Sequence, residues 1–132
     1  MSTDNHEDGR ERRRRERHYV YLAAELVVED ATPRVAITKD ISEIGLLLLA
    51  RAELAPEQEV DLKIYLPDKD LRTAVVRGRV VRVEELAEEE QGIWRDRIAF
   101  EFDEPQPELA TEFERFALDQ ARIYDRKRED PR

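Results

Sequence analysis

Apolar and polar residues alternate over several short runs of this chain, and the alternation constrains the fold more than any other feature. From Tyr19 to Val28 every even position is apolar, and the same period of two recurs from Val60 to Leu66. Successive side chains of a strand point to opposite sides, so this period indicates strands with one buried face. We predict strands at 19–28, 34–39, 46–50, 60–66, 73–83 and 98–102.

The longest predicted strand, 73–83, has a glycine in its middle. The alternation places Val76, Val80 and Arg82 on one face of this strand. Gly78 belongs to the same face, and a glycine inside a strand often marks a bulge or bend. We expect the acidic stretch that follows, Glu84 to Gln91, to be an exposed loop.

The period changes after Pro107, where Leu109, Phe113 and Phe116 begin an apolar stripe at helical spacing that continues to Tyr124. Proline suits the first turn of a helix, because the backbone N–H it lacks would have no partner there. Several short strands followed by one helix, without alternation of strands and helices, predict an all-β antiparallel barrel or curled sheet with a C-terminal helix.

Composition narrows the class of protein further. A chain of 132 residues without cysteine is long enough for one domain and can form neither a disulfide nor a thiolate metal site. No apolar stretch approaches the roughly 20 residues that cross a bilayer, and the first residues lack the apolar core of a signal peptide. We therefore expect a cytoplasmic protein without membrane insertion. The formal charge of −9 disfavours DNA as a partner.

The sequence contains no motif typical of a catalytic site or of a metal site. There is no nucleophile–base pair and no glycine-rich loop for phosphate, so we predict that the protein is not an enzyme. His6 and His18 lack the spacing and partners of metal ligands. We expect no metal and no cofactor, and a monomer or weak dimer.

Positive charge is concentrated in one block, residues 10–17, which holds six arginines and two glutamates. On an otherwise acidic protein, such a block suggests a small anionic partner that binds locally. The alternative is a solvated terminal arm, because blocks of like charge are often disordered. The block contains Arg13 and Arg17 in an RxxxR spacing, immediately before the first predicted strand.

A second short pattern, DxSxxG, consists of Asp40, Ser42 and Gly45, just before the predicted strand 46–50. Alone it is ordinary turn chemistry: the carboxylate would cap the turn and the glycine would supply a positive φ. The two patterns taken together, in this order and at this spacing, are more specific for one protein family than either pattern alone.

RxxxR followed by DxSxxG resembles the PilZ family of cyclic di-GMP receptors, over roughly residues 11–124. The resemblance implies a six-stranded antiparallel β-barrel, with an arginine-bearing segment that folds over ligand held on the barrel face. On this basis we expect a disordered N-terminus at 1–9, a PilZ-like domain at 10–125 and a polar tail at 126–132. Within the domain, 10–17 is the ligand-binding segment, 18–103 the barrel and 107–125 the helix.

The resemblance also implies that cyclic di-GMP is the ligand, and the chemistry of the motif residues agrees. Arg13 and Arg17 can pair with phosphate oxygens or a guanine edge, because the guanidinium fork matches both. Arg12 is a further expected contact. The carboxylate of Asp40 can accept hydrogen bonds from the N1–H and exocyclic amine of guanine. Of the remaining two residues, Ser42 can donate to phosphate or hold the turn, and Gly45 allows close approach of the ligand.

The function that follows is a cyclic di-GMP receptor whose arginine segment becomes ordered on ligand binding and which then signals to a downstream protein. The alternative is a PilZ-like module that binds a partner protein and no nucleotide. A third possibility makes the arginine block an anchor for nucleic acid or anionic lipid. Trp94 can flank a guanine or pack on the barrel edge. Arg15 and Glu16 depart from the residues that the family often carries inside RxxxR.

Overall fold

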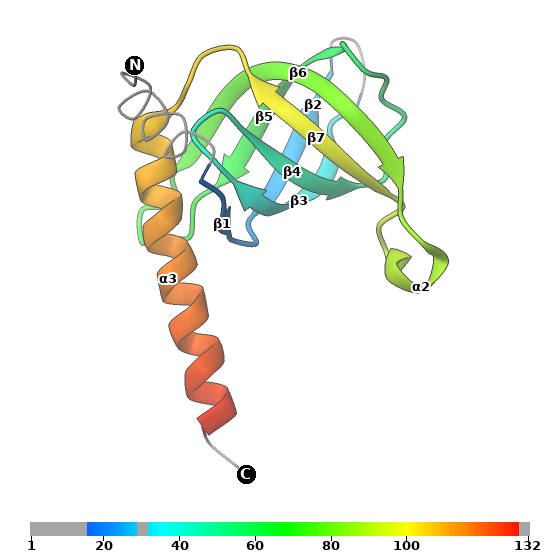
Figure 1. Cartoon of the computed structure of the whole chain (residues 1–132). Coiled ribbons are helices and arrows are strands. Elements are labelled where there is room, and N and C mark those ends of the chain that lie inside the picture. The colour runs from blue at the N-terminus through cyan, green and yellow to red at the C-terminus, as the bar shows by residue number, and fades with distance from the viewer. Residues whose placement is uncertain (1–15, 29–31, 130–132) are drawn as a thin grey trace, which may run out of the picture.

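The predicted runs form the strands of one antiparallel sheet, shown in Figure 1. The structure is a computed structural model that describes residues 16–28 and 32–129, with side chains as far as residue 123. Its elements are β1 (His18–Tyr19), β2 (Ala23–Val27), β3 (Arg34–Ile41), β4 (Gly45–Ala50), β5 (Glu59–Tyr65), β6 (Thr73–Glu85), α2 (Glu88–Gln91), β7 (Asp96–Phe102) and α3 (Pro107–Glu129).

The sheet closes on itself, and the closure confirms the predicted barrel. The strand order is β1-β3-β2-β5-β6-β7-β4, and β4 pairs in turn with β3. Strands β2 to β7 therefore form a six-stranded barrel without a free edge between them. The short β1 lies end to end with β2 along the same edge of β3.

The core lies inside the barrel and continues under α3. The inward positions of the predicted strands are buried, as the alternation requires, with Leu26, Leu62 and Ile98 fully inaccessible to solvent. At the end of the barrel the helix contributes Phe113, which is also fully buried. Burying a side chain of this size contributes about 1.5–3 kcal/mol to folding. The helix begins at Pro107, as expected, and extends to Glu129.

Gly78 has a different role from the bulge that the sequence suggested. It pairs regularly with Val60 and with Phe102, and the irregularity of β6 falls between Val80 and Arg82. A Cβ at Gly78 would lie 2.1 Å from the carbonyl oxygen of Glu101. The glycine is thus required by the close approach of β7. The acidic stretch 84–91 is not simply a loop either, because β6 continues to Glu85 and α2 follows.

The first predicted strand is interrupted, and Thr38 of β3 fills the interruption. Its hydroxyl donates to the carbonyl oxygen of Val20 at 2.6 Å and accepts from the amide of Leu22 at 2.8 Å. Its own amide donates to the carbonyl oxygen of Leu22 at 2.9 Å. One buried side chain therefore satisfies the two backbone groups, the Val20 carbonyl and the Leu22 amide, that the incomplete pairing between β1 and β2 leaves over.

Replacing Thr38 by valine is expected to lower the free energy of unfolding by about 1–3 kcal/mol. Valine has nearly the same shape but leaves the buried amide of Leu22 without an acceptor. Urea unfolding followed by circular dichroism measures the difference. Thr38→Ser is the control, because it keeps the hydroxyl. If Thr38→Val were as stable as the wild type, the bridging role would be wrong.

The helix is attached to the start of the barrel by one side-chain amide. Gln120 accepts a hydrogen bond from the amide of Tyr21 at 3.0 Å and donates to the carbonyl oxygen of the same residue at 2.9 Å. Figure 1 shows α3 passing beside β1 and extending beyond the barrel. Within the described part of the chain, no helix is long and apolar enough to cross a membrane.

Candidate functional site

The pairing of β1 with β3 brings together two residues that the sequence separates. In this pairing Tyr19 lies opposite Asp40, so Arg17, just before β1, reaches the same place. The guanidinium of Arg17 donates to the carboxylate of Asp40 and forms an ion pair with it. The Asp40 side chain is only 10% exposed, whereas that of Arg17 is 46% exposed. The arginine thus compensates the charge of a nearly buried carboxylate.

A bulge in β3 turns Asp40 toward the outer surface of the barrel. Thr38 lies opposite Leu48, but Asp40 lies opposite Leu47, so Lys39 is an extra residue in the pairing. Thr38 and Leu48 point into the core, whereas Leu47 is outward and only half-buried. Without the bulge, Asp40 would share the inward face of Thr38. Bulges commonly redirect a side chain in this way.

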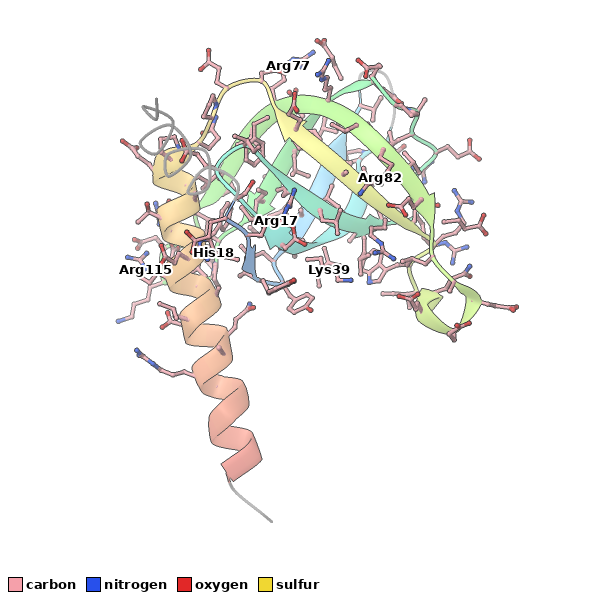
Figure 2. All side chains as sticks on the ribbon, viewed as in Figure 1. Arg17, His18, Lys39, Arg77, Arg82 and Arg115 are labelled. Atoms are coloured by element: carbon pink, nitrogen blue, oxygen red, sulfur yellow. The ribbon has the colours of Figure 1, made fainter. Side chains whose placement is uncertain are left out.

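A second bulge, in β6, turns Arg82 to the same outer surface. Val80 lies opposite the inward Phe100, and Arg82 lies opposite Ala99, which leaves Val81 as the extra residue. The prediction that Arg82 shares the face of Val80 is therefore wrong. Figure 2 shows Arg17 and Arg82 on the same side of the barrel. Sequence reasoning missed Arg82 as a member of the site because a regular strand points it inward.

These residues surround one pocket of about 330 Å³ on the outer surface of the barrel. Arg17 and Asp40 lie on one side of it and Arg82 with Glu101 on another, so the pocket offers two cations and two anions. Its floor is apolar. The residues that line it are Arg17, Asp40, Ile44, Gly45, Leu46, Leu47, Val81, Arg82, Ala99, Phe100 and Glu101. We call this the ligand pocket.

Gly45 lines the ligand pocket because β7 passes very close to it. A Cβ at this position would lie 2.3 Å from the carbonyl oxygen of Phe100. Its φ is not positive, so the alternative explanation through a left-handed turn is wrong. The glycine is required by the packing of β4 on β7, and its small size also leaves the pocket open.

Ser42 lies behind the pocket and holds the turn between β3 and β4. Its hydroxyl donates to the carbonyl oxygen of Gly45 at 3.2 Å and accepts from the amide of Ile44 at 3.3 Å. Its amide also donates to the Gly45 carbonyl oxygen at 2.8 Å. The residue is buried and does not line the pocket. Of its two predicted roles, these contacts favour holding the turn.

The remaining residues predicted for the site either lie outside the described residues or do not line the pocket. Arg12 and Arg13 lie outside the described residues, as do the predicted terminal segment 1–9 and most of the arginine block. Trp94 is half-buried next to the start of β7, and Gly45 lies opposite the far end of that strand. Trp94 does not line the ligand pocket. Among the described residues, no group of His, Asp or Glu side chains could hold a metal ion.

The family model of the PilZ domain matches residues 11–119 of this sequence. The chain belongs to the PilZ domain family. The match spans both short patterns, the RxxxR spacing and the DxSxxG turn, together with the whole barrel and the first half of α3. Comparison with the curated proteins gives no match.

Solved structures share the PilZ fold at low sequence identity. The PilZ domain of YcgR from Escherichia coli, with c-di-GMP, has a TM-score of 0.64 at 16% identity and covers 89% of this chain and 98% of its own. The inhibitor of motility MotI (DgrA) of Bacillus subtilis has a TM-score of 0.61 at 15% identity, covering 88% and 51%. The K. pneumonia MrkH–c-di-GMP complex has 0.57 at 17% identity, covering 89% and 56%. The chain therefore spans about half the length of MotI and MrkH.

Proposed function

We propose that this PilZ domain is a receptor for cyclic di-GMP and binds it in the ligand pocket. The observation that carries the proposal is the meeting of Arg17, Asp40 and Gly45 around one pocket, because these residues come from both short patterns. Two of the structural neighbours are solved with c-di-GMP, and the proposal extends that ligand to this chain. It acts as a receptor and not as an enzyme.

The ion pair of Arg17 and Asp40 acts, in this proposal, as the resting state of the site. Cyclic di-GMP carries two phosphodiester anions that compete for the arginine and a guanine edge that competes for the carboxylate. Both charges therefore exchange one partner for another and neither becomes unpaired. This matters because a nearly buried carboxylate without a partner is costly.

Arg12 and Arg13 supply further charge to the phosphates in the proposed complex. The arginine block carries like charges close together, and two bound phosphates neutralise them. We therefore propose that the block becomes ordered on the barrel when ligand binds, which changes the surface shown to a downstream protein. Ser42 contributes by holding the turn that presents Asp40 and Gly45.

Calorimetric titration of the full chain with cyclic di-GMP tests the receptor function, with cyclic di-AMP as the base control. We expect saturable binding of cyclic di-GMP, and binding of cyclic di-AMP that is weaker by at least about tenfold, because adenine cannot donate as guanine does to Asp40. The absence of heat and of any thermal shift at high cyclic di-GMP concentration would overturn the proposal. It would leave a PilZ domain that binds a partner protein only.

Arg82→Ala is expected to weaken cyclic di-GMP binding roughly 5- to 20-fold, because it removes one of the two described cations of the pocket. The effect is moderate, since Arg82 donates to Glu84 at 2.7 Å and is well exposed. Titration calorimetry measures it. Arg77→Ala is the matched control, because Arg77 also points outward from β6 but pairs with Glu59 and Asp61. Equal losses of cyclic di-GMP affinity in both variants would show that the loss reflects net charge and not a contact of Arg82.

A further inference from the structure

Three arginines meet near the end of β4 that is opposite to Gly45. Arg34, Arg51 and Arg95 line one hollow of about 250 Å³, together with Ala52 and Glu53. They come from three neighbouring segments: the start of β3, the residue after β4 and the residue before β7. Strand β4 has Gly45 at the ligand pocket and Ala50 next to Arg51. At about 3.3 Å per residue, Gly45 and Arg51 lie roughly 15–20 Å apart.

A second hollow, of about 420 Å³, adjoins the first and is less polar. It shares Ala52, Glu53 and Arg95 with the arginine hollow. It then continues over the half-buried side chain of Leu54 to Ala55 and Val83. We call the two hollows together the rim groove. One end of the rim groove thus carries three arginines beside Glu53, and the other end presents Leu54, Ala55 and Val83 next to Gln58 and Asp96.

Two of the three arginines have no carboxylate partner in the described part of the chain. Neither Arg34 nor Arg51 forms an ion pair with a described residue, and the one acidic side chain that lines their hollow is Glu53. By contrast, each of three other surface arginines, Arg72, Arg77 and Arg79, pairs with two carboxylates. The chain has 32 acidic residues against 23 basic ones, so partners are plentiful. Adjacent cations on neighbouring strands repel each other, and an anion between them relieves that repulsion.

The surroundings favour a compact acid over a long polyanion. Arg95 is already engaged, because it donates to the buried carboxylate of Asp96. The short helix α2 leads into this end of the barrel and carries three consecutive glutamates, Glu88 to Glu90. Figure 1 shows α2 projecting next to the start of β7. A nucleic acid or an anionic membrane would meet these three glutamates as well as Glu53, whereas a single carboxylate between Arg34 and Arg51 would have only Glu53 as an acidic neighbour in the hollow.

We propose that the rim groove is a docking site for an extended segment of a partner protein, in which an acidic side chain is followed closely by an apolar one. The acid binds between Arg34 and Arg51, where the guanidinium groups donate charge-assisted hydrogen bonds. The apolar side chain occupies the hollow formed by Leu54 and Val83. This site goes beyond the proposed receptor function and does not depend on it, because the rim groove and the ligand pocket have no lining residue in common.

Nuclear magnetic resonance of the ¹⁵N-labelled full chain tests this proposal with a short probe, acetyl-Gly-Glu-Ser-Leu-Gly-amide. We expect saturable shift changes at the amides around Arg34, Arg51 and Leu54 at millimolar peptide. A matched peptide with glutamine in place of glutamate should bind at least about fivefold more weakly. The double variant R34E/R51E should lose binding. Lys69→Glu, at an exposed position of the β5–β6 connection, is the matched control and should keep it.

Several results would overturn the proposal. These are the absence of saturable shifts, equal binding of the glutamate and glutamine peptides, or equal binding to R34E/R51E and the wild type. Inorganic phosphate that produces the same shifts with the same affinity as the peptide would indicate a small-anion site instead. Binding of duplex DNA or phosphatidylserine vesicles that is lost in R34E/R51E, without peptide binding, would indicate a polyanion surface.

Discussion

Arg17→Ala is expected to weaken cyclic di-GMP binding by about 100-fold or more, the largest effect of any single change in this chain. Arginine offers paired hydrogen bonds to a phosphate, and hydrogen bonds to charged groups each contribute about 1.5–3 kcal/mol. Two such bonds correspond to roughly two to four powers of ten in affinity. Arg17 is also the arginine that the pairing of β1 with β3 fixes next to Asp40.

The test is titration calorimetry of the wild type, Arg17→Ala and Arg17→Lys. Lysine keeps the charge but not the planar fork, so its affinity should lie between the other two. Arg72→Ala is the control for general charge, because Arg72 pairs with Asp68 and Glu112 away from the ligand pocket. Circular dichroism checks that each variant is folded. An affinity for Arg17→Ala within twofold of the wild type would refute the assigned role.

The second large effect is expected for Asp40→Asn, and it concerns selectivity as much as affinity. The carboxylate accepts two hydrogen bonds from guanine, whereas the asparagine amide presents one acceptor and one donor group. A bidentate contact of this kind is worth about 1–3 kcal/mol of base discrimination. We therefore expect cyclic di-GMP binding to fall roughly 10- to 100-fold, and the preference over cyclic di-AMP to shrink with it.

Measuring both nucleotides against Asp40→Asn separates two roles of the carboxylate. If Asp40 reads guanine, the preference for cyclic di-GMP falls. If it only positions Arg17, the affinity falls but the preference is unchanged. The double variant adds a second criterion, because residues that act through one another are non-additive. If Asp40 acts only by positioning Arg17, the double variant, Asp40→Asn with Arg17→Ala, should lose no more binding free energy than Arg17→Ala alone.

Alternation was sufficient to predict the inward faces of most strands. Leu26, Leu62 and Ile98 are buried where the period of two places them, because a closed barrel has one inner face and a slip of one residue would expose it. The helix start at Pro107 followed from the change of period. Both depend on local patterns, which is why they could be predicted from the sequence.

The site was predictable only in part, because its geometry depends on pairing between distant strands. Nothing in the local sequence distinguishes Lys39 or Val81 from a regular strand residue, yet each is the extra residue of a bulge. The two bulges decide that Asp40 and Arg82 point outward. Likewise, the contact of Arg17 with Asp40 follows from the register of β1 on β3, which alternation does not specify.

The amide of Gln120 joins the two ends of the described chain. Its partner, Tyr21, is 99 residues away in the sequence and only four residues after Arg17. Detaching the second half of α3 from the barrel therefore breaks two hydrogen bonds to the backbone just beyond β1, close to the proposed ligand-binding segment. Because these two bonds join both ends, we expect that a ligand which tightens the arginine segment on the barrel also makes the helix harder to detach.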